Sequence, residues 1–270
     1  MSRTSQRSTF RLIAAAVIPA YRSLAVPRWR GTENIPASGG FVVVSNHLTE
    51  IDPITVAYAV YKAGVMPRFL AKESLFRVPV LGPVLTRIGQ VPVYRGTSRA
   101  KDSLKAAFAE LASGGAIIVY PEGTITRDPQ MWPMRGRTGA ARLALQADVP
   151  VVPMVHWGDQ EIVYRDPQGH RTAKPFPPKR VDGIVGEPLR ASDLVPGGLK
   201  HPGEPSSEEL ATATATIMAT VARLLGELRG EPAPQELLDP RAPRRAASSD
   251  PGDAAVPEDD LGSAGGSVAP

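Results

Sequence analysis

The chain has 270 residues, of which 42% are hydrophobic and 21% charged, enough for one sizeable domain with additional segments. It contains no cysteine, which excludes a disulfide scaffold, a thiolate zinc site and a cysteine nucleophile. The formal net charge of +4 is unevenly distributed: residues 1–30 contain six arginines and no acid, whereas residues 231–270 contain eight acids and three arginines. A basic segment beside a nearly neutral middle suggests a partner for that segment.

The basic segment, residues 1–30, surrounds a short apolar run from Leu12 to Tyr21. The run is shorter than the roughly 20 residues that a membrane-spanning helix requires, and Pro19 interrupts it. We expect an interfacial segment, with apolar residues in the lipid and arginines on anionic headgroups at the cytoplasmic face of the cell membrane. The apolar run favours a membrane over nucleic acid as the partner. The alternative is a helix packed on the domain's own surface.

Residues 31–230 alternate between strand and helix patterns. Continuous apolar, β-branched runs predict strands, and apolar residues at i, i+3 and i+4 predict helices. The expected strands are 40–45, 67–72, 90–94, 116–120, 150–156 and one near 181–186. The expected helices are 52–63, helical turns from 73 to about 88, 98–112 with Ser98 as its cap, and 138–147. This alternation predicts an α/β sandwich with a mixed, largely parallel central sheet flanked by helices.

A capping-box pattern, Ser206 with Glu209, predicts the start of one more helix. An apolar stripe follows and ends at Gly230. We expect this helix to cover the sheet, the alternative being an interaction helix. Residues 231–270 are rich in Pro, Ala, Gly, Ser and acids and predict a disordered acidic tail.

The strand at 40–45 leads into Asn46 and His47, and Asp52 comes five residues after the histidine. Asp52 followed by Pro53 is typical of a helix start, with Asp52 as N-cap and Pro53 at the first helical position. His47 should therefore lie at the carboxyl edge of the sheet, where open α/β folds usually place their chemistry. A carboxylate that holds one ring nitrogen fixes the tautomer, so His47 with Asp52 suits a general base.

Three further blocks follow in order. A short strand ends at Arg95, a buried strand runs into Pro121-Glu122-Gly123-Thr124, and Val149-Pro150-Val151-Val152-Pro153 is an apolar segment bounded by prolines. Together with Asn46-His47-x4-Asp52, these blocks resemble the glycerolipid acyltransferase family over about residues 31–190. The resemblance implies the same α/β fold class for this region.

The resemblance also implies a reaction: direct transfer of a fatty acyl group from acyl-CoA or acyl carrier protein to the free hydroxyl of 1-acyl-sn-glycerol 3-phosphate. His47 would remove the hydroxyl proton and Asp52 would orient its ring, while Ser45 is the alternative as a nucleophile. No cofactor is expected beyond the thioester co-substrate, and no metal, because the four histidines show no ligand spacing. The alternatives are another acceptor, such as glycerol 3-phosphate, another lysophospholipid or a glycolipid, or a non-catalytic lipid-binding role on this fold.

A site for the acceptor's phosphate is implied by the same resemblance. Arg95 at a strand end can present two parallel donors to phosphate oxygens, and Lys72 stands where the family often has a basic residue. Gly123 lets the backbone approach closely, and Thr124 adds a hydroxyl and an amide. Glu122 is expected either to orient Arg95 or to hydrogen-bond an acceptor hydroxyl.

One departure from the family pattern concerns this phosphate site. The third block of the family commonly continues Gly-Thr-Arg, but here Ile125 stands in the arginine's place. Arg127, two residues later, is our expected substitute, with Arg135 and Arg137 as alternatives. The apolar segment 131–134 lies between them and is expected either to touch lipid or to pack as an ordinary loop.

Overall fold

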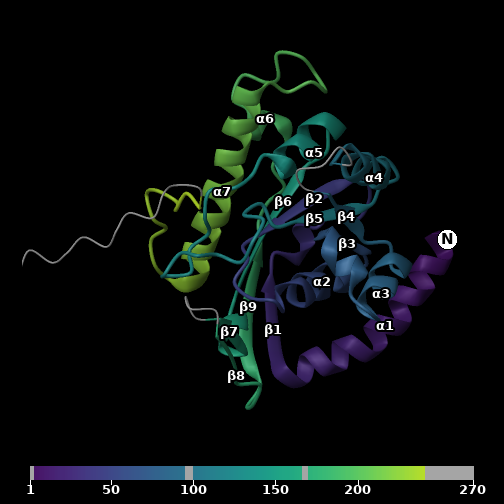
Figure 1. Cartoon of the computed structure of the whole chain (residues 1–270). Helices are drawn as coiled ribbons and strands as arrows, with labels where there is room; N and C mark the ends of the chain where they lie inside the picture. Colours follow the sequence, from purple (N-terminus) through teal and green to yellow (C-terminus); the bar gives the residue numbers. More distant parts are fainter. Residues whose placement is uncertain (1–2, 95–99, 166–169, 241–270) are drawn as a thin grey trace, which may run out of the picture. The chain divides into compact units, whose positions relative to one another are not determined.

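The computed structural model describes residues 3–94, 100–165 and 170–240. In this part seven strands form one sheet, in the order β1-β9-β6-β2-β5-β3-β4 (Figure 1). All neighbours in the sheet run parallel except β6 and β9. The strands are β1 (Ala25–Arg30), β2 (Phe41–Ser45), β3 (Pro67–Lys72), β4 (Val91–Val93), β5 (Ala116–Val119), β6 (Val151–Trp157) and β9 (Lys179–Val185). The mixed, largely parallel sheet confirms the predicted fold class.

Helices cover both faces of the sheet (Figure 1). The α-helices are α1 (Arg3–Leu24), α2 (Asp52–Lys62), α3 (Leu81–Arg87), α4 (Ala100–Ala112), α5 (Gly139–Ala147), α6 (Ala191–Leu194) and α7 (Ser207–Arg229). Short 3-10 helices are η1 (Thr32–Asn34), η2 (Glu73–Arg77) and η3 (Asp159–Glu161). A separate hairpin pairs β7 (Val163–Arg165) with β8 (Arg171–Ala173) in antiparallel fashion.

The central strand β2 is buried on both faces. Val42 and Val44 belong to the core cluster shared with α4, α5 and α7. Phe41 and Val43 belong to the cluster shared with α2 on the other face. A strand in this position needs apolar side chains in both directions, which explains its continuous rather than alternating apolar sequence.

Most predicted elements are present in the structure. The expected strands 40–45, 67–72, 90–94, 116–120 and 150–156 correspond to β2, β3, β4, β5 and β6, and their ends differ by at most one residue. β9 begins at Lys179, two residues earlier than expected. The expected cap of α4, Ser98, lies outside the described residues.

The sequence pattern does not predict β1. This strand pairs only with β9 at the edge of the sheet, and its residues alternate between buried and exposed positions. Arginines at the exposed positions and a proline in the middle give it the composition of a linker. Residues 25–30, which the sequence places in the basic segment, are therefore part of the central sheet.

The C-terminal helix α7 begins with the expected capping box. The Ser206 hydroxyl accepts a hydrogen bond from the Glu209 amide at 3.2 Å, and the Glu209 carboxylate accepts one from the Ser206 amide at 2.7 Å. The helix ends at Gly230, whose φ of 73° is left-handed. Its apolar stripe, which includes Ile217, packs on the sheet, so the helix covers the sheet as expected.

Residues 231–240 continue from α7 and pack on the domain. Ala233 and Leu237 contact the core cluster, and the Arg135 amide donates to the Leu238 carbonyl at 2.9 Å. The sequence analysis expects these residues to belong to a disordered tail because their composition is that of one. The rest of that tail, residues 241–270, lies outside the described residues.

Helix α1 packs along α2 with one face. Tyr21 is buried, its hydroxyl oxygen lies 3.0 Å from that of Thr55, and the ring of Phe10 contacts Tyr61 with centroids 5.2 Å apart. The opposite face is open, and Leu12 is 75% exposed there. Within the described ranges, no helix combines the length and apolar character needed to cross a bilayer. Contact of α1 with a lipid surface stays a prediction.

Replacing Ile217 by alanine tests the role of α7 as a cover for the sheet. The side chain is fully buried, so Ile217→Ala should lower the free energy of unfolding by about 2–5 kcal/mol. The measurement is chemical denaturation followed by circular dichroism. The matched control is Thr212→Ala on the exposed face of the same helix, which should stay within about 0.5 kcal/mol of the parent. Equal effects of the two substitutions would contradict the packing described.

Candidate active site

His47 lies directly after β2, and Asp52 is the first residue of α2. The His47 Nδ1 atom is 2.9 Å from Asp52 Oδ2, and because a carboxylate only accepts, Nδ1 donates. The Asp52 side chain is 0% exposed and that of His47 17%. Among the described residues, His47 Nε2 has no hydrogen-bond partner, so the second ring nitrogen is available to a substrate.

The predicted N-cap role of Asp52 is wrong. Ile51 occupies the N-cap position, and the Asp52 carboxylate turns back onto the preceding loop instead. Its Oδ2 atom accepts hydrogen bonds from the Leu48 and Thr49 amides, the latter at 2.9 Å, and Oδ1 accepts from the Thr49 hydroxyl at 2.6 Å. The carboxylate therefore organises the loop that carries His47 and not the helix terminus.

The electrostatics of Asp52 favour its ionised form. Burial by itself raises the pKa of Asp52, but the nearby His156 and the hydrogen bond from His47 hold it below its ordinary value. An ionised carboxylate fixes His47 in the tautomer that leaves Nε2 unprotonated. This is the arrangement that a general base requires.

The Glu122 carboxylate also holds the loop that carries His47. Its Oε1 atom accepts a hydrogen bond from the His47 amide at 3.2 Å, and Oε2 accepts from the Met134 amide at 3.0 Å. The side chain is buried, and burial raises the pKa of Glu122 to about 8 in spite of these two amides. Its described contacts thus hold the backbone of His47, a role that the sequence analysis did not assign to it.

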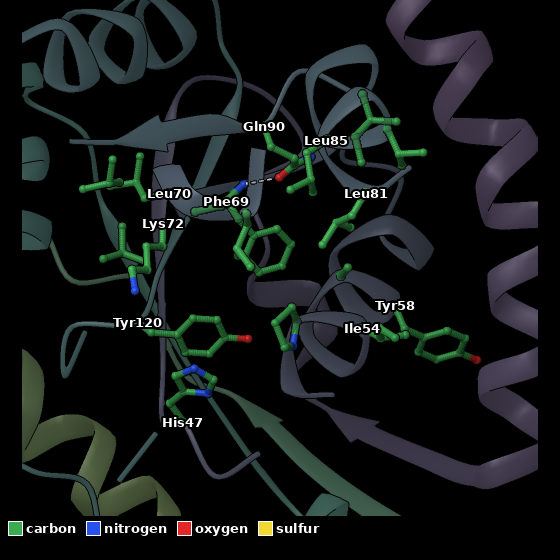
Figure 2. A pocket seen from close by; sticks show the side chains of 18 of the residues that line it. His47, Ile54, Tyr58, Phe69, Leu70, Lys72, Leu81, Leu85, Gln90 and Tyr120 are labelled. Atoms are coloured by element: carbon green, nitrogen blue, oxygen red, sulfur yellow. Dashed lines mark hydrogen bonds between the residues drawn. The ribbon is translucent and has the colours of Figure 1, made fainter. Parts of the chain in front are cut away.

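His47 opens onto an apolar cavity of about 690 Å³. The cavity is lined by apolar and aromatic side chains of α1, α2, β3 and α3, among them Phe10, Ile13, Val17, Ile54, Tyr58, Phe69, Leu81 and Leu85 (Figure 2). Tyr120 stacks on the His47 ring, with centroids 4.2 Å apart, at one end of the cavity. The candidate base therefore meets a space suited to a long apolar group.

The expected phosphate-binding residues are distributed unevenly around this cavity. Lys72 and Gly123 line it, and in Figure 2 the Lys72 ammonium points toward the end that holds His47. Thr124 and Arg127 are not among the lining residues, whereas Arg137 is. Of the three arginines considered as substitutes, Arg137 is thus the one at the cavity.

Two other predictions concern Arg95 and Ser45. Arg95 lies outside the described residues, so the structure says nothing of it. Ser45 is fully buried and does not line the cavity. A nucleophile in that position would have no access to a substrate in the cavity.

The apolar segment 131–134 packs as an ordinary loop. Trp132 and Met134 are buried in the domain. The Arg229 guanidinium lies over the rings of Trp132 and Trp157, at 4.2 and 4.3 Å from their centroids. This contact joins the loop to the end of α7, and it decides the alternative left open by the sequence in favour of packing.

Several site residues are missing from the sequence-based prediction: Asn46, Tyr120, His156 and Asp159. His156 lies on β6, which runs parallel to β2 and ends at the same edge of the sheet as His47. The shared edge of these two strands is the sequence-based signal that could have placed His156 near His47. Asp52, His156 and Asp159 also form, in the described part of the chain, a group whose potential metal-ligand atoms lie within 4.8 Å of one another.

Comparison with known proteins agrees with this geometry. Residues 26–157 match the model of the Acyltransferase family, a range that contains the His47–Asp52 pair and the block 121–124. The fold and the site together thus define an acyltransferase domain. Residues 26–157 thus belong to the acyltransferase family.

Individual relatives extend the comparison. A chloroplastic 1-acyl-sn-glycerol-3-phosphate acyltransferase of Brassica napus is 32% identical over 142 residues, which are 52% of this chain and 40% of the relative. The 1-acyl-sn-glycerol-3-phosphate acyltransferase of Bacillus subtilis is 28% identical over 200 residues, 73% of this chain and 86% of the relative. The crystal structure of the 1-acyl-sn-glycerophosphate acyltransferase of Thermotoga maritima matches with a TM-score of 0.62 and 25% identity, over 85% of this chain and 83% of that chain. The chain thus spans about two fifths of the plant relative's length.

The buried Glu122 gives a pH-dependent prediction. Because its pKa is raised from 4.5 to about 8 in the folded chain, its contribution to stability is complete below pH 4.5 and is lost as the pH rises toward 8. Glu122→Gln removes this titration. The free energy of unfolding of the parent, relative to Glu122→Gln, should therefore fall between pH 5 and pH 8, by up to about 1.4 kcal/mol per pH unit.

Denaturant unfolding at a series of pH values measures this difference. The exposed Glu204→Gln serves as the control and should show no such trend relative to the parent. A constant difference between the parent and Glu122→Gln across the range would show that the buried carboxyl does not titrate there.

Proposed function

We propose that this chain transfers a fatty acyl group from a thioester, acyl-CoA or acyl-acyl carrier protein, to the free hydroxyl of 1-acyl-sn-glycerol 3-phosphate, which gives phosphatidic acid. One observation carries the proposal. The His47–Asp52 pair opens directly onto an apolar cavity of about 690 Å³ that is also lined by the cations Lys72 and Arg137. An acyl chain and an anionic headgroup are the two chemical parts that such a cavity fits. The names of the relatives support the same acceptor.

The reaction needs one base and no acyl-enzyme. The acceptor hydroxyl gives its proton to His47 Nε2 while its oxygen attacks the thioester carbonyl, and the Asp52 carboxylate stabilises the imidazolium that forms. Collapse of the tetrahedral intermediate breaks the carbon–sulfur bond, and the leaving thiolate takes the proton back from the imidazolium. Stacking on Tyr120 and the Glu122 contact to the backbone hold the ring in place during both transfers.

The acceptor's phosphate is assigned to the basic residues of the cavity. Lys72 supplies a compact point charge, and Arg137 supplies a planar fork that matches two phosphate oxygens. The Gly123 backbone lies at the same cavity and has a φ of 74°, a left-handed conformation that favours glycine. Arg95 and Thr124 remain part of the proposal on the strength of their motifs alone.

The surface of α1 supports a place of action at a membrane. Its inner face lines the cavity, and its outer face carries the exposed Arg7, Arg11 and Arg22 together with Leu12. Arginines and apolar residues on one helix surface suit the headgroup region of an anionic bilayer. The chain would thus act as a peripheral or monotopic protein at the cytoplasmic face of the membrane, where its lipid acceptor is found.

Substitution of His47 tests the reaction and its base together. His47→Ala should lower turnover by about 10²–10⁴-fold, because general-base catalysis contributes that much. Thiol release from acyl-CoA, with and without 1-acyl-sn-glycerol 3-phosphate, measures the rate, and the cysteine-free chain adds no thiol of its own. The control is His201→Ala, because His201 is exposed and lies in the segment between α6 and α7. Near-normal turnover by His47→Ala would remove His47 from the mechanism.

The same assay separates the alternatives. Acyl carrier protein replaces CoA in a parallel series, and glycerol 3-phosphate, lysophosphatidylethanolamine and monoacylglycerol replace the acceptor. Release that depends on 1-acyl-sn-glycerol 3-phosphate above the others supports the proposed acceptor. Binding of lysolipid without release from either donor would favour the non-catalytic lipid-binding role.

Arginine substitutions test which residue takes the place of the missing arginine after Thr124. Arg137→Ala should raise the acceptor KM by about ten-fold or more, the effect of losing a charged hydrogen bond, with little change in kcat. Arg127→Ala, outside the cavity, should stay within about two-fold of the parent. The test also includes monoacylglycerol, which lacks the phosphate and should not distinguish Arg137→Ala from the parent. The reverse ranking of the two variants would assign the phosphate to Arg127.

A further inference from the structure

A second histidine lies behind the His47–Asp52 pair. His156, on β6, is fully buried, and its ring stands between two buried carboxylates. Its Nδ1 atom lies 2.7 Å from Asp159 Oδ2, and its Nε2 atom lies 3.8 Å from Asp52 Oδ2. The same Asp52 oxygen is 2.9 Å from His47 Nδ1, so the two imidazoles share one carboxylate oxygen.

Contacts from neighbouring elements hold the backbone of His156 and the Asp159 carboxylate in position. The Asn46 side chain binds the His156 backbone twice: its Oδ1 accepts from the amide at 3.1 Å and its amide donates to the carbonyl at 3.0 Å. The Thr55 hydroxyl donates to Asp159 Oδ1 at 2.8 Å, and its oxygen lies 3.0 Å from that of Tyr21. The group thus links the loop after β2 to α2 and, through Tyr21, to α1.

The spacing of these groups is also that of a metal site, but their orientation differs. A metal ligand presents one ring nitrogen to an ion that the carboxylates share. Here the two ring nitrogens of His156 lie near different carboxylates, at 2.7 and 3.8 Å and without hydrogen-bond geometry, so the imidazole stands between the two carboxyl groups. Two buried carboxylates require a positive charge nearby. Burial lowers the pKa of His156, but Asp52 and Asp159 together raise it above its ordinary value.

We propose that His156 is a protonated positioning residue that offsets the charge of Asp52 and thereby weakens the hold of Asp52 on the proton that His47 takes up. A carboxylate beside an imidazole favours the imidazolium form. A cation on the far side of the same carboxylate oxygen weakens that effect. The catalytic consequence rests on the proposed function, whereas the charge of His156 does not.

The other titratable groups around this pair add no competing cation within the described residues. His156 and Asp52 are faced by Asp159 from η3, Tyr21 from α1, and Tyr120 and Glu122 from the segment after β5. Burial raises the pKa of both tyrosines and raises that of Glu122 to about 8, so each of these shifts favours the uncharged form. The balance of charge is therefore set by His156 against the two aspartates.

The first test measures the charge of His156 without any substrate. The full chain is labelled with ¹⁵N at its histidine rings, and the ring nitrogen shifts are followed from pH 6 to pH 9 in the presence of EDTA. Single Gln substitutions of His47, His170 and His201 assign the four rings by elimination, so the assignment does not need a His156 variant to fold. We expect one ring, that of His156, to keep imidazolium shifts throughout.

Two results would overturn the proposal at this stage. One is a neutral His156 ring at pH 7. The other is a ring whose shifts change only when Zn²⁺ or Mg²⁺ is added to EDTA-free protein, which would identify the group as a metal site. Neither result depends on whether the chain transfers acyl groups.

The second test measures the pH profile of kcat/KM in His156→Gln. Without the cation, Asp52 holds the proton on His47 more strongly, so the acidic limb should move to higher pH. The loss should be about ten-fold or more at pH 6.5 and within about three-fold at pH 8.5, as expected for a base that is protonated at the lower pH. A pH-independent loss would indicate a merely structural role and overturn the proposal.

Matched variants keep this second test interpretable. Asp159→Asn leaves the His156 cation beside Asp52 and removes only the carboxylate on its other side, so it should not move the acidic limb to higher pH. The exposed His201→Gln is the control and should leave the profile unchanged. If the parent shows no transfer with any acceptor, the proposed function fails, and the charge of His156 is still decided by the ring nitrogen shifts.

Discussion

A buried carboxylate needs hydrogen-bond donors for its oxygens and positive charge nearby. At Asp52 this requirement determines how the elements around the candidate site are arranged. The Thr49 amide and hydroxyl, the His47 ring and the His156 ring all converge on the Asp52 carboxylate. These groups come from the loop after β2, the start of α2 and the strand β6. The three elements therefore take one relative position, and the candidate base takes one orientation.

Much of the fold follows from the sequence because local pattern and burial agree there. The run from Phe41 to Ser45 is apolar at every position, as a strand covered on both faces requires, and the capping box at Ser206 marks the start of a long helix. The motif containing His47 and Asp52 identifies the acid–base pair itself, since the two side chains are only five residues apart.

The rest of the site depends on contacts that no local pattern reports. Asp52 was expected to cap its own helix, but the loop before it offers more donors to the carboxylate than the helix end does. The Glu122 carboxylate binds the backbone of His47. Arg137 lines the cavity although it follows the Pro-Glu-Gly-Thr block, residues 121–124, by about a dozen residues. Tertiary packing sets each of these positions, and the spacing of residues along a single sequence does not report it.

Helix α1 has two surfaces with different environments. Its inner side chains, Phe10 and Ile13 among them, form part of the cavity wall, and Tyr21 reaches the buried polar group behind His47. Its outer side chains, such as Leu12, face away from the domain. Shortening or replacing this segment to change the behaviour of the protein in solution would thus also reshape the cavity and remove the contact between Tyr21 and Thr55. In the proposed function, one segment of the chain thus has two roles, contact with the lipid surface and formation of the cavity wall.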